Sequence, residues 1–140
     1  MLRRRRSTFV VAGLLVMMVA VAACNQGCAT TTTGKGYDVI KAANIVLDTS
    51  MTYLGDEYKA GRLSEEDRAT AKQVGAQVQA AIRTAITALA TYKRLEDADK
   101  LAPGDADKLK VVVDAILSAQ KILTDYVAAA AKAKAEGGDG

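Results

Sequence analysis

Apolar residues recur at alternating steps of three and four along three long segments of the chain. Such steps place side chains on one face of an α-helix, so the pattern predicts three amphipathic helices. The first helix, over residues 37–60, has a stripe formed by Ile40, Ala43, Leu47, Met51, Leu54 and Tyr58. The second, which Ser64 opens and which ends by Leu101, has Ala71, Val74, Val78, Ala81, Ala85, Leu89 and Tyr92. The third, from Asp105 to about residue 134, has Leu109, Val112, Ile116, Ala119, Leu123, Tyr126 and Ala130.

The residues between these segments are ones that end or begin helices. Gly61 can adopt a positive φ without a steric penalty, so we expect it just past the first helix. The Ser64 hydroxyl can accept a backbone N–H at the start of the second helix, and the three acidic residues that follow suit the positive end of the helix dipole. Residues 102–105 (Ala-Pro-Gly-Asp) have the order of a type II turn, after which Asp105 should cap the third helix.

Short connections between helices require antiparallel neighbours. We therefore expect an all-α fold, an up-down-up three-helix bundle over residues 37–134 in which the second and third helices form a long hairpin. Because the first predicted helix is the shortest, it leaves the end of this hairpin uncovered, and an uncovered apolar stripe usually marks a contact. The candidate partner surface at this tip consists of Leu89, Tyr92, Leu95, Leu109, Val112 and Ile116, with Leu101 beside them. The alternative is that these residues satisfy one another across the hairpin.

The first 23 residues follow a different pattern. Four arginines at positions 3–6 precede an uncharged apolar run from about Phe9 to Ala23, and the run ends in Val21-Ala22-Ala23-Cys24. A basic start, a short apolar stretch and small residues at its end are typical of a secretory signal peptide. A membrane-spanning helix needs about 20 apolar residues, so this shorter run disfavours an uncleaved membrane helix. A twin-arginine export signal is a further alternative.

The order aliphatic, small, small, Cys resembles the lipobox of bacterial lipoproteins. The resemblance implies that the Cys24 thiol carries a diacylglyceryl group, that cleavage follows Ala23, and that the new amino terminus is acylated. In that family an Asp directly after the modified Cys often retains the protein in the inner membrane. Asn25 stands there instead, which favours the outer membrane and the periplasmic side.

Residues 24–36 have no apolar periodicity and contain three glycines, which predicts a flexible tether between the lipid and the bundle. Because the first helix begins at this tether, the tip of the hairpin should point toward the membrane. Residues 135–140 are small and polar and predict a disordered tail.

Removal of the signal peptide changes the net charge. The whole chain has 19 basic and 16 acidic residues, but four of the basic ones lie at positions 3–6 and all acidic ones follow Cys24. The mature chain would carry 15 basic and 16 acidic side chains, a net charge of −1. It lacks the net positive field that nucleic-acid binding requires, so we expect no nucleic-acid partner.

The chain contains no His, and His is the commonest general base and a common metal ligand. We therefore expect no catalytic site, no cofactor and no metal. Lipidation of Cys24 would preclude an internal disulfide, which leaves Cys28 as a spare thiol or as a link to a second chain. Acidic residues gather at positions 96–107, but a calcium loop counted from Asp97 would need Gly at position 102 and an acid at position 108, and the chain has Ala and Lys there. A solvated turn is the favoured interpretation.

These observations predict a lipid-anchored envelope protein whose bundle is a non-enzymatic structural or partner-binding module. Its partner would be a second copy of the chain or another envelope protein. The alternative is a lipoprotein of a phage or mobile element that acts in lysis or surface exclusion.

Overall fold

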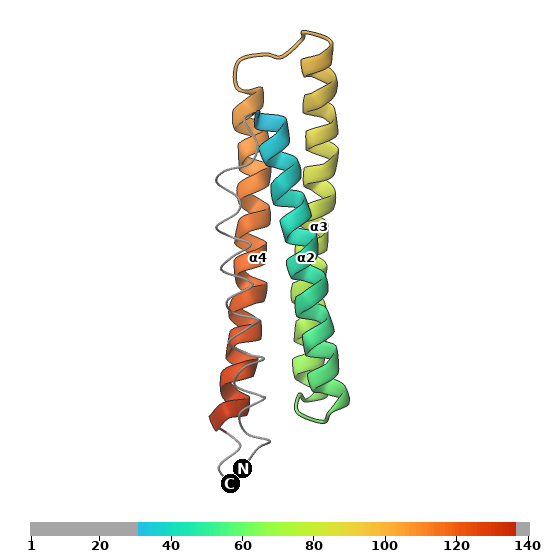
Figure 1. Cartoon of the computed structure of the whole chain (residues 1–140), viewed down its shortest axis with the longest axis vertical. Coiled ribbons are helices and arrows are strands. Elements are labelled where there is room, and N and C mark those ends of the chain that lie inside the picture. The colour runs from blue at the N-terminus through green and yellow to red at the C-terminus, as the bar shows by residue number, and fades with distance from the viewer. Residues whose placement is uncertain (1–30, 137–140) are drawn as a thin grey trace.

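The computed structural model describes residues 31–136, which form three long helices packed side by side (Figure 1). They are α2 (Thr32–Lys59), α3 (Glu65–Asp97) and α4 (Asp105–Glu136). Helices α2 and α4 run in the same direction, α3 runs opposite to them, and each helix contacts the other two. The predicted all-α, up-down-up bundle with a long α3–α4 hairpin is confirmed. The predicted signal segment 1–23, residues 24–30 of the tether and the tail 137–140 lie outside the described residues.

The core lies along the line where the three helices meet. Leu89 of α3 and Ile116 and Leu123 of α4 are among its largest fully buried side chains. Each such residue contributes about 1.5–3 kcal/mol relative to an exposed one. Ala43 and Ala85 are fully buried as well, and their small side chains let the helices approach closely. The stripes predicted for α3 and α4 supply half of this core.

The buried face of α2 is wider than its predicted stripe. Val39, Ser50 and Glu57 are buried in addition to the predicted residues, whereas Leu47 and Met51 are only half-buried. The reason is that α2 packs against both α3 and α4, so two adjacent stripes of its surface are in contact. A single stripe with three-four spacing describes only one of these contacts.

Helix α2 begins at Thr32, five residues earlier than predicted. The Thr31 hydroxyl oxygen accepts the Gly34 N–H at 3.0 Å and caps this first turn. Gly36 then lies against Leu89, where an added Cβ would come within 2.8 Å of a Leu89 methyl carbon. The prediction that the tether extends to residue 36 is therefore wrong. The residues that suggested flexibility instead allow α2 to extend along α3.

The connection between α2 and α3 has the predicted helix-ending and helix-capping residues. Gly61 has a φ of +70°, and the Arg62 N–H donates to the Glu57 carbonyl oxygen at 3.0 Å, which closes the end of α2. At the start of α3, the Ser64 hydroxyl oxygen accepts the Asp67 N–H and the Asp67 carboxylate accepts the Ser64 N–H. This reciprocal pair is a capping box.

The connection between α3 and α4 ends in the predicted type II turn. Gly104 has a φ of +90°, and the Asp105 N–H donates to the Ala102 carbonyl oxygen at 3.2 Å. The capping role predicted for Asp105 is wrong, because Asp105 is the first residue of α4 and not the residue that precedes the helix. Its carboxylate accepts the Ala102 N–H at 2.8 Å and so stabilises the turn.

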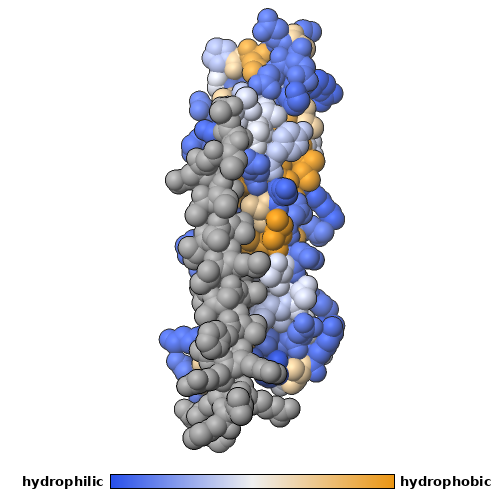
Figure 2. All heavy atoms as spheres, viewed as in Figure 1, coloured by the Kyte–Doolittle hydropathy of each residue, from blue (hydrophilic) through white to orange (hydrophobic). Residues whose placement is uncertain are grey.

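On the face shown in Figure 2, hydrophilic residues predominate. Hydrophobic residues form small separate groups there, near mid-length and at the end that carries the α3–α4 connection. Within residues 31–136 no helix has both the length and the apolar content needed to cross a bilayer.

Candidate functional site

The predicted partner surface at the hairpin tip is mostly buried within the bundle. Leu89, Tyr92, Leu109 and Ile116 are 1%, 9%, 3% and 0% exposed, so they are not available to a partner. The prediction failed because α2 is longer than expected. Its additional residues 32–36 extend along this end, where Gly36 lies against Leu89.

Two residues of that predicted surface remain half-buried. Leu95 and Val112 line a small open groove of about 230 Å³ between α3 and α4. On the α2 side of the same end, the Thr33 hydroxyl donates to the Glu96 carboxylate at 2.9 Å and joins α2 to α3. The tip as a whole is therefore not an uncovered apolar surface.

Cys24 and Cys28, the predicted lipidation site and the free thiol, lie outside the described residues. Within residues 31–136 no group of three acidic or other metal-ligating side chains is arranged to hold a metal ion. In the acidic segment around the α3–α4 connection, the Asp97 carboxylate pairs with Lys93 at 2.8 Å and the Asp105 carboxylate with Lys108 at 2.9 Å.

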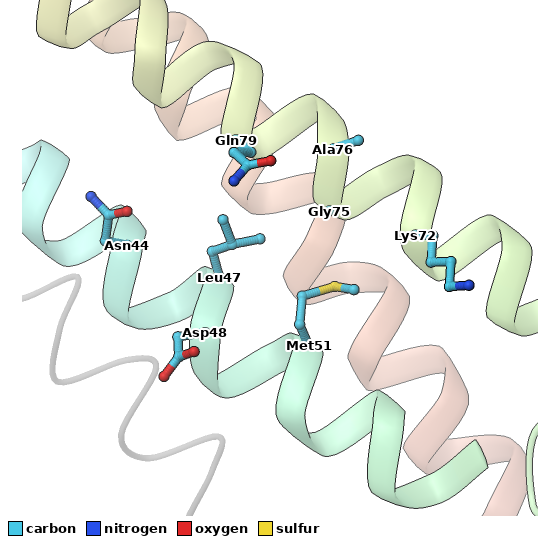
Figure 3. A pocket seen from close by; sticks show the side chains of 8 residues that line it. All are labelled: Asn44, Leu47, Asp48, Met51, Lys72, Gly75, Ala76 and Gln79. Carbon is cyan, nitrogen blue, oxygen red and sulfur yellow. The ribbon is translucent and has the colours of Figure 1, made fainter. Parts of the chain in front are cut away.

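A groove of about 420 Å³ runs between α2 and α3 on the surface (Figure 3). Leu47 and Met51 of α2 reach across toward α3 and form its apolar floor. Its remaining lining residues are Asn44, Asp48, Lys72, Gly75, Ala76 and Gln79.

Gly75 determines the shape of this groove. A Cβ added at Gly75 would lie 2.7 Å from the Met51 sulfur, so the absence of a side chain lets α2 and α3 approach. The sequence carried one signal of this contact, a glycine inside an otherwise regular helical stripe. With an apolar floor and amide and charged groups around it, the groove suits an apolar surface such as the side of a helix.

A buried carboxylate lies at the end of the bundle that carries the α2–α3 connection. The Glu57 side chain is 8% exposed. It accepts two hydrogen bonds from the Arg62 guanidinium at 2.6 and 2.9 Å and one from the Lys134 ammonium at 3.2 Å. The hydrogen bonds from Arg62 are the main reason that the pKa of Glu57 is lowered. Burial opposes this effect, and the hydrogen bond and positive charge of Lys134 add to it. The ion cluster thus joins α2, its following loop and α4.

Tyr53 lies one turn before Glu57 on α2. Its hydroxyl is buried and has no hydrogen-bond partner among residues 31–136. Burial, followed by the negative charge of Glu57, raises the pKa of the Tyr53 phenol. The Tyr53 phenol therefore adds no hydrogen bond to the Glu57 cluster.

Sequence reasoning missed the Glu57 cluster because its members are far apart in the chain. Arg62 is only five residues from Glu57, but Lys134 is 77 residues away. The other ion pairs between described residues join positions three or four apart in one helix.

Comparisons with known proteins identify no relative of this chain. No protein-family model matches the chain, and no curated protein or solved structure is significantly similar to it.

Proposed function

We propose that this chain is a lipid-anchored protein of the bacterial cell envelope and that its three-helix bundle is a non-enzymatic structural or partner-binding module. The observation that carries this proposal is the ordered N-terminal sequence: arginines at 3–6, an uncharged apolar run, and Val21-Ala22-Ala23-Cys24. The absence of His from the sequence supports the non-enzymatic part, since the commonest general base is missing.

The bundle has dimensions that suit a short spacer. Seven residues, 25–31, separate Cys24 from the first residue of α2. Even when fully extended they reach at most about 25 Å, so the start of α2 would stay close to the bilayer. Helix α3 has 33 residues and is about 50 Å long at 1.5 Å per residue. A bundle anchored in this way can carry a contact surface tens of ångströms from the membrane.

The contact surface in this proposal is the groove between α2 and α3, and its occupant is a helix of another envelope protein. The small, exposed side chain of Ala76 leaves room for the ridge of an approaching helix. The unbranched side chain of Met51 can adjust to that ridge. Ile86 is 49% exposed and lies seven residues after Gln79, which places it on the same side of α3.

Metabolic labelling with a clickable palmitate tests the anchor. Cys24→Ser should abolish labelling, whereas the matched variant Cys28→Ser should retain it, because residues 25–27 (Asn-Gln-Gly) do not resemble a lipobox. Labelling of Cys24→Ser at the level of the unaltered chain would overturn the proposal. Fractionation of the labelled protein should recover it with the outer membrane.

A photoreactive residue at Gln79, in the groove, tests the contact surface in whole cells. The matched control is the same residue at Asp125, an exposed position on α4. An adduct with one defined envelope protein from position 79 alone is the expected result. An adduct of twice the chain's mass would instead assign the groove to a second copy of the chain, and equal adducts from both positions would contradict a groove-specific contact.

A further inference from the structure

The two ends of the bundle present different loops to solvent. The Glu57 end is the part formed by residues 57–68 and 126–136, and the Leu101 end is the part formed by residues 32–37 and 89–109. Figure 1 shows that the α3–α4 connection lies at the same end as the start of α2. Thr31, the described residue nearest in sequence to Cys24, therefore lies at the Leu101 end.

Apolar side chains are exposed at this end. Leu101 is 40% exposed in the loop, and Tyr37 on α2 is 53% exposed. Figure 2 shows hydrophobic residues gathered at this end among hydrophilic ones. The loop at the Glu57 end differs, because its leucine, Leu63, is half-buried against the core.

Backbone hydrogen bonds hold Leu101 in its outward position. On one side of it, the Lys100 N–H donates to the Leu95 carbonyl oxygen at 2.8 Å and closes the end of α3. On the other side, the Ala102 N–H donates to the Asp105 carboxylate at 2.8 Å. The loop thus presents Leu101 from a fixed backbone, so little conformational entropy remains to be lost when this side chain is buried.

The charges at the Leu101 end nearly balance. Segment 93–108 carries four basic residues, Lys93, Arg94, Lys100 and Lys108, and five acidic residues, Glu96, Asp97, Asp99, Asp105 and Asp107. Two oppositely charged pairs are already formed, Lys93 with Asp97 and Lys108 with Asp105. A contact made by this end would therefore depend on its apolar side chains and not on a net charge.

We infer that the α3–α4 loop rests on the bilayer and buries Leu101 in the interface between headgroups and acyl chains. This inference depends on the proposed anchoring through Cys24. The seven residues between Cys24 and α2 keep this end within about 25 Å of the lipid anchor, so the bilayer surface is held at a high local concentration around Leu101. The amphipathic ring of Tyr37 suits the same interface.

Tryptophan fluorescence tests the inference directly, because the chain has no Trp of its own. The variant Leu101→Trp, in the full lipidated protein, is reconstituted into phosphatidylcholine vesicles with and without brominated acyl chains. We expect the Trp at position 101 to emit at a shorter wavelength than a Trp exposed to water, and to be strongly quenched by the brominated lipid. The matched control is Lys59→Trp, at a 79%-exposed side chain at the other end, which should show neither effect.

A second reporter position tests Leu101 itself, because a Trp placed at position 101 has its own preference for interfaces. Tyr37→Trp leaves Leu101 unchanged and should also be quenched by brominated lipid. Adding Leu101→Asp to this background should reduce the quenching severalfold, whereas adding Lys59→Asp, at an exposed side chain of the Glu57 end, should not.

The outcomes separate this inference from the proposed function. Vesicle-bound protein with unquenched Trp at position 101 would overturn the loop contact and leave the anchor intact. Failure of the protein to float with the vesicles would remove the anchor and overturn both. Quenching that requires anionic lipid would contradict an apolar contact.

Discussion

The Glu57 end and the Leu101 end are closed by different kinds of interaction. At the Glu57 end a buried carboxylate joins α2, its loop and α4 through Arg62 and Lys134. At the Leu101 end the described side-chain hydrogen bond between helices is that of Thr33 with Glu96, and most of the packing is apolar, around Leu89. The end near the proposed anchor therefore depends on apolar burial, whereas the far end also depends on charge.

The largest effect should come from breaking the apolar packing of the Leu101 end. Leu89 is 1% exposed, so Leu89→Asp would bury an unpaired carboxylate and cost on the order of several kcal/mol of unfolding free energy. The control Arg83→Asp, at an exposed position of α3, should cost under about 1 kcal/mol. Thermal unfolding would compare them, and equal melting temperatures would contradict the assigned buried face.

Breaking the ion cluster should have the next largest effect. Glu57→Gln keeps the shape of the side chain but removes its charge, which should cost about 2 kcal/mol because its charged hydrogen bonds are lost in a buried site. The matched variant Glu96→Gln, at the exposed carboxylate of the Leu101 end, should cost much less. Urea unfolding curves provide the measurement. Equal losses for the two variants would show that the ends do not differ in this way.

The helices, their order, the end of α2 and the turn before α4 could be predicted because they depend on local chemistry. Three-four spacing identified the faces of α3 and α4, Gly61 and Ser64 marked the first connection, and Pro103-Gly104 marked the second. The start of α2 could not be predicted in this way. Thr and Gly have weak helix propensity, and what supports this turn is packing of Gly36 on Leu89, a residue distant in the sequence.

The error in the predicted partner surface followed from the wrong start predicted for α2. With α2 starting at Tyr37, Leu89 and Tyr92 appear uncovered, whereas the observed helix buries both. The Glu57 cluster and the α2–α3 groove depend on register between helices, which places Lys134 beside Glu57 and Met51 beside Gly75. Residue periodicity identifies faces of a helix but does not give this register.

Acid should weaken the Glu57 end selectively. The pKa of Glu57 is held below its ordinary value of 4.5, chiefly by the hydrogen bonds from Arg62. A carboxyl group whose folded-state pKa is lowered stabilises the fold above its unfolded-state pKa, and this stabilisation is lost as the pH falls through the folded-state pKa. The stability difference between the unaltered chain and Glu57→Gln should be constant near neutral pH and should shrink below about pH 4.5. A difference that grows on acidification would contradict the cluster's role.

The smallest effects concern the helix ends, where the two loops use different residues at the same backbone position. Gly61 and Asp99 each lie two residues after the last residue of a helix and have a positive φ, +70° and +55°. No atom lies within 4 Å of a Cβ added at Gly61, so Gly61→Ala should cost about 1 kcal/mol through backbone strain alone. Asp99→Gly should stabilise the chain by up to about 1 kcal/mol at the Leu101 end. Unfolding curves that show the opposite signs would contradict these backbone assignments.

The most direct test of the difference between the ends is amide hydrogen exchange along the Cys24→Ser chain, which should lack the lipid. A helix normally frays at its end, but Lys134 near the end of α4 is bound to the buried Glu57. We predict that Glu57→Gln accelerates exchange over residues 130–136 and leaves exchange over residues 32–37, at the other end, unchanged. Unchanged exchange over residues 130–136 in Glu57→Gln, or equal acceleration at both ends, would contradict the account.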